Sequence, residues 1–297
     1  MSDLFEEYRP LLFGIAYRML GGVADAEDMV QETFLRWQKQ DAVTVGSAKA
    51  WLISTVTRLS IDQLRSARRK REEYVGVWLP EPIVGADENA MSPAKMAALT
   101  DSLGLAFMHL LEDLAPLERA VFILREAFDY DYSDIAAIVE KSEANCRQLF
   151  SRAKSHLAQR ELKEEPAGEK AERVVQQFLE ACATGDMQSF LAVLTDDAVL
   201  YSDGGGKVRA ALKPIYSAEF IGRFYMGIRH RSYAGAQVEI VRVNGKVGAI
   251  VRRKDGSAVV TAFAFAGDRI ASIYLVSNPD KLRWLLPSST DGAGGSN

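Results

Sequence analysis

The sequence predicts a multidomain protein in which two all-α domains are followed by one α+β domain. Three observations lead to this prediction. Apolar residues recur at spacings of three and four through most of the first 160 residues. A stretch rich in proline and glycine, residues 76–100, divides this helical part in two. Beyond residue 171, two further helices precede strand-like runs joined by short turns, which is typical of an α+β domain.

The chain has 297 residues, enough for two or three domains that each have a core. The predicted segments are a helical domain at 1–75, a linker at 76–100, a second helical domain at 101–162, a linker at 163–170, the α+β domain at 171–286 and a disordered tail at 287–297.

The first helical domain is predicted to contain three helices. An apolar stripe at 11–20 predicts the first, and Gly21-Gly22 ends it. Asp25 is placed to cap the second helix, with Asp28 three residues further on, as in a capping box. A third apolar pattern covers about 48–71.

The linker at 76–100 carries a short apolar motif. Trp78-Leu79 lies between Pro80 and Pro82 and is too apolar for a passive spacer. We therefore expect this motif to dock on another part of the protein.

The second helical domain ends in two short helices joined by a tight turn at Glu140-Lys141. Ser133 is placed to cap the first helix and Ser142 the second. The second helix has an apolar back and a basic, amide-rich front, which is the form of a major-groove recognition helix. An ordinary helical hairpin with a solvated face fits the same pattern. The residues predicted to contact DNA are Ser142, Asn145, Arg147, Gln148, Ser151, Arg152, Lys154 and Ser155.

The α+β domain is predicted to begin with helices at about 171–184 and 186–194. Strand-like runs follow at 198–201, 237–243, 246–253, 257–265 and 269–276. Asn244-Gly245 is a strong two-residue hairpin signal, and Asp255-Gly256 and Gly267-Asp268 mark the next turns. These features predict an antiparallel meander.

Composition excludes several classes of protein. The net charge is -4, so any contact with nucleic acid depends on local basic patches. The two cysteines, Cys146 and Cys182, and the three scattered histidines predict neither a disulfide framework nor a metal site. The N-terminus lacks the apolar core of a signal peptide, and no apolar run is long enough to span a membrane. We expect a cytoplasmic protein without a cofactor.

Two charged segments are candidate binding surfaces. The segment 58–71 has six basic residues and one acid, which fits phosphate neutralisation better than a solvated helix end. The candidate DNA-binding residues of the helix at 48–71 are Trp51, Arg58, Asp62, Arg65, Arg68, Arg69, Lys70 and Arg71. The acidic helix before Phe34 and Trp37 fits either a dipole effect or a protein-docking face. Its candidate docking residues are Asp25, Glu27, Asp28, Gln31, Glu32, Phe34 and Trp37.

The helical part resembles a known family. DAEDMVQETFLRW at 25–37, followed by AKAWLISTVTRLSIDQLRSARRKR at 48–71, resembles region 2 of bacterial sigma factors. The segment 116–157, beginning PLERAVFILREAFDYDYSDIAAIVEK, resembles sigma region 4. With only these two regions, the chain resembles the extracytoplasmic-function (group IV) RNA polymerase sigma factors. WLPEP at 78–82, DGGGK at 203–207 and NPDKL at 278–282 resemble the marks of the subfamily with a SnoaL-like C-terminal extension.

The resemblance implies a role for each segment. The helix at 25–37 would dock on the β′ clamp helices of core RNA polymerase. The helix at 48–71 would melt and read the -10 element of promoter DNA, with Trp51 as its single aromatic. The helix at 142–157 would read the -35 element in the major groove.

The C-terminal domain would be a SnoaL-like cone that packs against the linker and regulates the two DNA-binding domains. Since it is fused in cis, weak contacts suffice and no separate anti-sigma factor is needed. The expected contact has Trp78 as its apolar anchor. The residues expected to form it are Trp78, Leu79, Pro80, Glu81, Pro82, Asp203, Gly204, Gly205, Gly206, Lys207, Asn278, Pro279, Asp280, Lys281 and Leu282.

Two other interpretations stay open at the level of sequence. A ligand-sensing helix-turn-helix regulator would bind duplex DNA without polymerase. An enzyme would place its activity in residues 171–286, with Tyr201, Asp203, Arg229 and His230 as candidate groups in a pocket. The fold alone establishes no catalysis, so a regulatory domain, with or without a small ligand in its pocket, is favoured.

Overall fold

The computed structural model describes residues 2–40, 46–85, 104–158 and 168–285. The described chain divides into two compact units. The first comprises residues 1–74, 83–162 and 244–246, and the second comprises 75–82, 163–243 and 247–297. Each unit therefore includes a short segment whose neighbours in sequence belong to the other.

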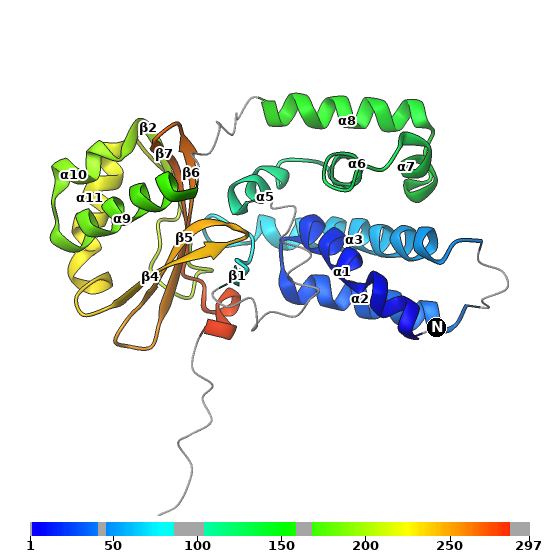
Figure 1. Ribbon diagram of the computed structural model, residues 1–297, viewed down its shortest axis with the longest axis horizontal. Helices are drawn as coiled ribbons and strands as arrows, with labels where there is room; N and C mark the ends of the chain where they lie inside the picture. The colour runs from blue at the N-terminus through cyan, green and yellow to red at the C-terminus, as the bar shows by residue number, and fades with distance from the viewer. Residues whose placement is uncertain (1, 41–45, 86–103, 159–167, 286–297) are drawn as a thin grey trace, which may run out of the picture. The chain divides into compact units, whose positions relative to one another are not determined.

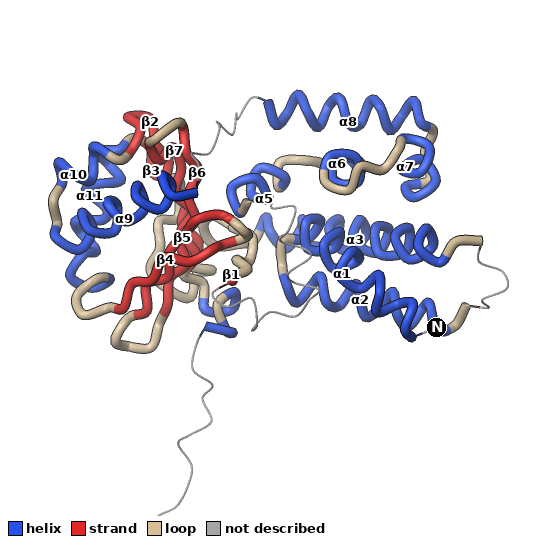
Figure 2. The backbone as a smooth tube through the Cα atoms, viewed as in Figure 1, coloured by secondary structure: helices blue, strands red, loops and turns tan. Residues whose placement is uncertain are grey.

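The first unit is helical (Figures 1 and 2). Its elements are α1 (Ser2–Leu20), α2 (Val23–Gln38), α3 (Ala48–Glu72), the two-residue strand β1 (Val84–Gly85), α5 (Leu105–Leu111), α6 (Pro116–Glu126), α7 (Tyr132–Val139) and α8 (Glu143–Ala158). The helices predicted in each half are confirmed. One apolar core runs through both halves, so the two predicted helical domains pack as one unit.

Two predicted helix caps are wrong. The second helix begins at Val23, with Gly22 at its N-cap, because Gly21 takes a left-handed conformation (φ +73°) that ends α1 directly before it. Asp25 thus lies in the first turn of α2. The α7 helix begins at Tyr132 after Asp131, so Ser133 is inside it. The Ser142 cap is confirmed, since its hydroxyl accepts the Asn145 amide at 3.2 Å.

A buried arginine joins the two halves of the first unit. Arg119 of α6 is 1% exposed, and it donates to the carbonyl of Met19 at the end of α1 and to the carboxylate of Glu112. Burial lowers the pKa of Arg119 to about 9, which still leaves it charged at neutral pH. A charge removed from water in this way depends on its partners.

Asn244, at the tip of a hairpin, forms buried hydrogen bonds within the first unit. It takes the left-handed conformation (φ +51°) that a two-residue hairpin turn requires, followed by Gly245 (φ +76°). Its buried side chain accepts the Ile83 amide at 3.1 Å and donates to the Tyr17 hydroxyl at 2.7 Å. The backbone amide of Asn244 donates to the Ile83 carbonyl oxygen at 2.7 Å.

The second unit is an α+β domain in which helices pack on one face of a curved sheet (Figure 1). Its elements are α9 (Gly168–Thr184), α10 (Met187–Ala192), β2 (Leu194–Asp203), β3 (Ile215–Tyr216), α11 (Ala218–Ser232), β4 (Gln237–Val243), β5 (Lys246–Arg252), β6 (Ala258–Ala266), β7 (Arg269–Val276), and the 3-10 turns η1 (Pro279–Lys281) and η2 (Arg283–Leu285).

The strand order β4-β5-β6-β7-β2-β3 corrects the predicted all-antiparallel meander. Strands β5, β6 and β7 are antiparallel neighbours, but β2 pairs with β7 in parallel, with Tyr201 opposite Tyr274. The connection from β2 to β7 runs through β3, α11 and strands β4 to β6, and α11 was not predicted from the sequence. A parallel pair needs such a long connection, because the chain must return to the same end of the sheet.

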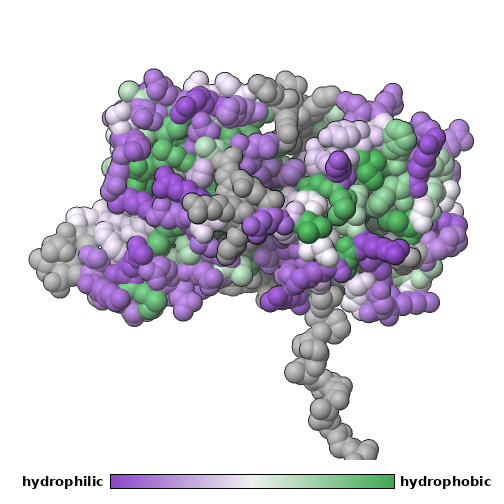
Figure 3. Space-filling view, turned by 180° about the vertical axis from the view of Figure 1, so that it is seen from behind, coloured by the Kyte–Doolittle hydropathy of each residue, from purple (hydrophilic) through white to green (hydrophobic). Residues whose placement is uncertain are grey.

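Hydrophilic residues cover most of the molecular face in Figure 3, with hydrophobic ones in smaller patches.

The segment predicted as the second linker is partly helical, because α9 begins at Gly168. The tail at 287–297 lies outside the described residues.

A double-mutant cycle tests the Arg119 node. Replacing Arg119 with Met leaves Glu112 and the Met19 carbonyl without their buried donor, and should lower the free energy of unfolding by about 3–5 kcal/mol. Denaturant unfolding measures the effect. The second change, Glu112→Gln, should restore part of the loss, because it removes the uncompensated charge. Equal losses in Arg119→Met and in the double variant would contradict this account.

Candidate functional site

The predicted recognition helix α8 is amphipathic, as expected from the sequence. Cys146, Leu149 and Ala153 are buried against the rest of the first unit. All eight predicted DNA-contacting residues from Ser142 to Ser155 are exposed. The helix therefore presents one polar face of the composition that reads base edges.

Charge pairing divides this face into two kinds of residue. Arg147 pairs with Glu143 at 3.2 Å, with its guanidinium 4.4 Å from the Tyr132 ring centroid. Arg152 pairs at 3.3 Å with Glu118, whose side chain is 9% exposed. Lys154 is 3.8 Å from Glu126. These ion pairs hold the three cationic side chains in position. Asn145 and Gln148, which are uncharged, are exposed on the same helix.

The basic helix α3 is engaged by α7. The Arg58 guanidinium donates to the carbonyls of Ile138 at 2.8 Å and Ala137 at 3.1 Å, and it pairs with Glu140 at 2.9 Å. These carbonyls end α7, where the helix dipole is negative. Arg65 pairs with Asp62 at 3.2 Å. The backbone of Arg68, Arg69, Lys70 and Arg71 continues α3, and their side chains lie outside the description.

Two predicted interface tryptophans belong to the core of the helical unit. Trp37 is 3% exposed, and its ring lies 5.4 Å from that of Trp51, which is half-buried. Trp37 therefore does not present its ring on a docking face as the sequence analysis expected. The apolar spacing of α2 turns this position inward, which the residue type alone did not reveal.

The other candidate docking residues lie on the outer side of α2. Asp25, Asp28 and Gln31 are exposed. Glu27 accepts from Arg9 at 2.9 Å, and Glu32 accepts from Arg36 at 2.8 Å. Phe34 is half-buried, with its ring centroid 4.8 Å from that of Phe5. An exposed acidic strip remains.

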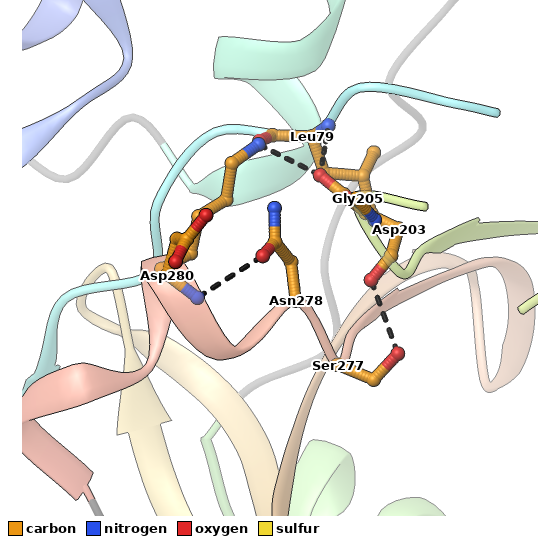
Figure 4. Close-up of polar contacts among 7 residues, drawn as sticks. Leu79, Asp203, Gly205, Ser277, Asn278 and Asp280 are labelled. Atoms are coloured by element: carbon orange, nitrogen blue, oxygen red, sulfur yellow. Dashed lines mark hydrogen bonds and ion pairs between the residues drawn. The ribbon is translucent and has the colours of Figure 1, made fainter. Parts of the chain in front are cut away.

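A buried carboxylate in the second unit brings together the three pentapeptides WLPEP, DGGGK and NPDKL (Figure 4). Asp203 is 0% exposed. Its Oδ2 accepts the backbone amide of Leu79 at 2.9 Å and the ammonium of Lys281 at 2.7 Å. Lys281 also donates to the Leu79 carbonyl, and its Nζ lies 4.1 Å from the Trp78 ring centroid. We call this arrangement the linker clasp.

The linker clasp fixes the backbone on both sides of Asp203. The Oδ1 of Asp203 accepts the Gly205 amide at 3.0 Å. The carbonyl of Asp203 accepts the backbone amides of Ser277 at 2.8 Å and Asn278 at 3.0 Å. The same carbonyl accepts the Ser277 hydroxyl at 3.1 Å (Figure 4). Ser277 precedes NPDKL and was not predicted. No pattern in the sequence distinguishes it from other serines.

Close packing explains the three glycines of DGGGK. A Cβ on Gly204 would lie 2.5 Å from the Val208 carbonyl oxygen. On Gly205 (φ +62°) it would lie 2.3 Å from the Asn278 amide nitrogen, and on Gly206 (φ +70°) it would lie 3.1 Å from the Cβ of Val75. Gly205 and Gly206 need both a left-handed backbone and a missing side chain.

NPDKL closes the clasp from the other side. Asn278 caps η1 by accepting the Asp280 amide at 3.0 Å, and Lys207 pairs with Asp280 at 2.5 Å. Hydrogen bonds from Lys207 and then Arg283 lower the pKa of Asp280. Leu282 is 1% exposed.

The apolar anchor of the linker differs from the prediction. Leu79 is 0% exposed, and Pro80 and Pro82 are also buried, whereas Trp78 and Glu81 are half-buried. Trp78 instead offers its ring face to the Lys281 ammonium. The backbone amide and carbonyl of the buried Leu79 are both bound within the clasp.

Of the four candidate enzyme groups, Arg229 and its neighbour His230 lie 3.4 Å apart, whereas Tyr201 and Asp203 make contacts elsewhere. Asp203 belongs to the clasp, and Tyr201 stacks on Tyr274 with 5.2 Å between the ring centroids. Arg229 donates to the carbonyls of Ala183 and Thr184, and His230 is exposed. Among the residues that the structure describes, no group of three or more His, Cys, Asp or Glu residues is placed to hold a metal ion. No helix in the described ranges is long and apolar enough to cross a membrane.

Family models and known relatives match most of this chain. Residues 4–70 match the family model for sigma-70 region 2, and residues 104–157 match that for sigma-70 region 4. The ECF RNA polymerase sigma factor SigJ of Mycobacterium tuberculosis is 35% identical over 288 residues, which are 93% of this chain and 91% of that protein. The probable ECF sigma factor SigI of the same species is 29% identical over 286 residues, 95% of this chain and 94% of that protein.

The crystal structure of SigJ from M. tuberculosis matches with a TM-score of 0.78 and 31% identity, over 97% of this chain and 99% of that chain. The resemblance to extracytoplasmic-function sigma factors is confirmed, and so is the order of the fold: region 2 and region 4 are helical, and an α+β domain follows. The chain belongs to the extracytoplasmic-function RNA polymerase sigma factors.

Proposed function

We propose that this sigma factor is regulated in cis by its C-terminal domain, which controls promoter-specific initiation by holding the linker at 75–82. The linker clasp carries this proposal. The linker leaves region 2 at the end of α3 and leads toward region 4, so its hold limits how far the two regions separate. Asp203 binds the linker through backbone groups of Leu79, and Lys281 reinforces the same contact.

The two DNA-binding regions are proposed to act as the family does. α8 reads the -35 element through Asn145, Gln148 and the neighbouring exposed residues, while α3 melts and reads the -10 element. The exposed acids of α2 dock on the β′ clamp helices of core RNA polymerase. These roles are supported by the exposed polar face of α8 and the acidic strip of α2.

The packing of α3 on α7 is proposed to be a resting arrangement. Arg58 is a candidate phosphate contact, yet in this structure it is bound to the end of α7 and to Glu140. The same guanidinium does not serve both partners at once. Promoter engagement by α3 therefore requires α7 to move away, and a restrained linker opposes that movement.

Regulation in cis needs no separate anti-sigma factor, because a covalently linked domain has a high effective concentration at the linker. We propose that the domain acts by binding and performs no catalysis. Asp255, a carboxylate that lines a cavity of this domain, is exposed, and hydrogen bonds from Ser257 lower its pKa, which disfavours a general acid. The protein would act in the cytoplasm, where core polymerase and promoter DNA are found.

Weakening the clasp should increase transcription. Asp203→Asn keeps an oxygen for the Leu79 amide but removes the charge that Lys281 pairs with. A hydrogen bond to a charged group contributes about 1.5 kcal/mol or more, so run-off transcription with core RNA polymerase should rise by about tenfold. Binding to core polymerase should be unchanged, since α2 is untouched.

Asp196→Asn is the matched control. Asp196 lies on the same strand and is fully exposed, and its ion pair with Arg269 is long, at 3.7 Å. It should leave transcription at the level of the unaltered protein. A folded Asp203→Asn variant with unaltered transcript yield would contradict regulation through the clasp.

Gln148→Ala should weaken recognition of the -35 element. Loss of a base contact costs about 1–3 kcal/mol, so affinity of the polymerase complex for the promoter should fall by about tenfold. The loss should disappear on a promoter whose -35 element has been scrambled. Gln188→Ala, an exposed glutamine on α10, is the control. Tight binding of the free protein to a palindromic duplex would instead favour a regulator that works without polymerase.

A further inference from the structure

The second unit contains a cavity of about 620 Å³ that is bounded by α11, by strands β2, β5, β6 and β7, and by the segment 208–211. A cavity of this size suits a small molecule. Most of its wall is apolar, with side chains of Val208, Phe224, Ile228, Val251, Val259 and Leu275. The body of a ligand that fills it is therefore apolar.

Most hydroxyl groups of this wall give a ligand little to bind. The hydroxyl oxygens of Ser202 and Tyr225 have almost no accessible surface, so a molecule in the cavity does not reach them. The Ser277 hydroxyl donates to the Asp203 carbonyl at 3.1 Å. The charged groups of the wall therefore decide which polar group of a ligand fits.

Arg253 is a half-buried cation of this wall, and the turn between β5 and β6 holds it in place. Its Nη1 donates to the Ser257 hydroxyl at 3.3 Å, and that hydroxyl donates to the Asp255 carboxylate at 2.6 Å. The backbone amide of Arg253 donates to the Ser257 carbonyl at 2.8 Å, which closes the turn. The guanidinium is thus positioned before a ligand binds, and such preorganisation lowers the entropy lost on binding.

The wall carries one net positive charge. Among its described residues, the charged ones are two arginines and one aspartate: Arg209, Arg253 and Asp255. Asp255 stays ionised at neutral pH, because hydrogen bonds from Ser257 lower its pKa. Arg209 and Asp255 are exposed, so water and salt screen their charges more than that of the half-buried Arg253. The least screened charge in the wall is therefore positive.

A carboxylate satisfies this wall better than a neutral group of the same shape. A neutral ligand that covers Arg253 would take water from the guanidinium and offer no charge in return. A carboxylate offers two oxygen atoms, which match the fork of N–H donors on an arginine. A dianion such as a phosphate monoester would bring more negative charge than the wall offsets.

We propose that this cavity binds an apolar monocarboxylate, with Arg253 as the ionic partner of its carboxylate and the apolar wall around its body. Arg209 adds to the attraction of an anion from the exposed part of the wall. Binding at this site is independent of the regulation proposed for the linker clasp, so either can fail without the other.

Calorimetric titration of the full-length protein with two probes tests the ligand class. 2-Naphthoate and 2-naphthamide have the same apolar body and nearly the same shape, and they differ in charge. 2-Naphthoate should bind about tenfold more tightly, because hydrogen bonds between charged groups are stronger than those to a neutral amide. Equal affinities, tighter binding of 2-naphthamide, or no binding of 2-naphthoate would overturn the proposed ligand class.

Arg253→Gln tests the ionic partner. It should weaken 2-naphthoate by about tenfold and leave 2-naphthamide unchanged, and Arg253→Lys should restore part of the loss because the charge returns. Arg252→Gln is the matched control, since Arg252 is the neighbouring half-buried arginine, lies outside the cavity wall and donates to the Leu285 carbonyl at 3.2 Å. Unchanged affinity for 2-naphthoate in a folded Arg253→Gln variant would show that another group binds the carboxylate.

Ile228→Trp tests the location without touching the arginine. Ile228 is half-buried in the cavity wall, so a larger side chain there should fill the cavity and weaken both probes by at least about tenfold. Phe220→Trp, at an exposed position of the same helix outside the wall, is the control and should change neither affinity. If Ile228→Trp binds 2-naphthoate as the unaltered protein does, the acid binds elsewhere and the proposed site is wrong. This comparison also decides the question if Arg253→Gln does not fold.

Discussion

The carboxylate of Asp203 is the group on which the C-terminal domain's hold on the linker depends. A fully buried carboxylate is costly unless every part of it is paired, and here two oxygens receive an ammonium and two backbone amides. The donors come from three places in the sequence. The 2.9 Å bond from Leu79 recruits the linker, that from Gly205 shapes the glycine loop, and that from Lys281 recruits the C-terminal turn. One desolvated charge thus explains why three distant pentapeptides occur together.

The sequence predicted the parts of the molecule in which local rules decide. The helices followed from apolar periodicity, and the hairpin at Asn244-Gly245 followed from turn chemistry. The grouping of the three pentapeptides came from the family resemblance, and the structure adds the bonds that hold them. What local patterns missed depends on contacts distant in sequence. The parallel pairing of β2 with β7 joins the first and last long strands of the second unit, and periodicity within one segment does not predict which strands become neighbours.

Individual site residues show the same limit. The exposed face of α8 was predictable, since its buried positions recur every three or four residues. Trp37 and Trp51 were assigned to surfaces by residue type, but they pack on each other across α2 and α3. Arg58 was assigned to phosphate, but the structure binds it to α7.

These features fit a protein with a closed and an open arrangement, as the proposed function requires. A domain that binds the linker changes the balance between closed and open arrangements only by the difference in its binding to the two. In the proposed function, the Arg58 bonds favour the closed arrangement, and promoter phosphates would favour the open one by offering the same residue new partners. The linker clasp stabilises the closed arrangement only if opening strains the linker or releases it from the clasp. Because Asp203 binds the Leu79 backbone rather than a mobile side chain, a displacement of the linker by even one residue breaks these bonds. The hold is therefore strongly dependent on linker position, which is the property that a regulatory contact requires.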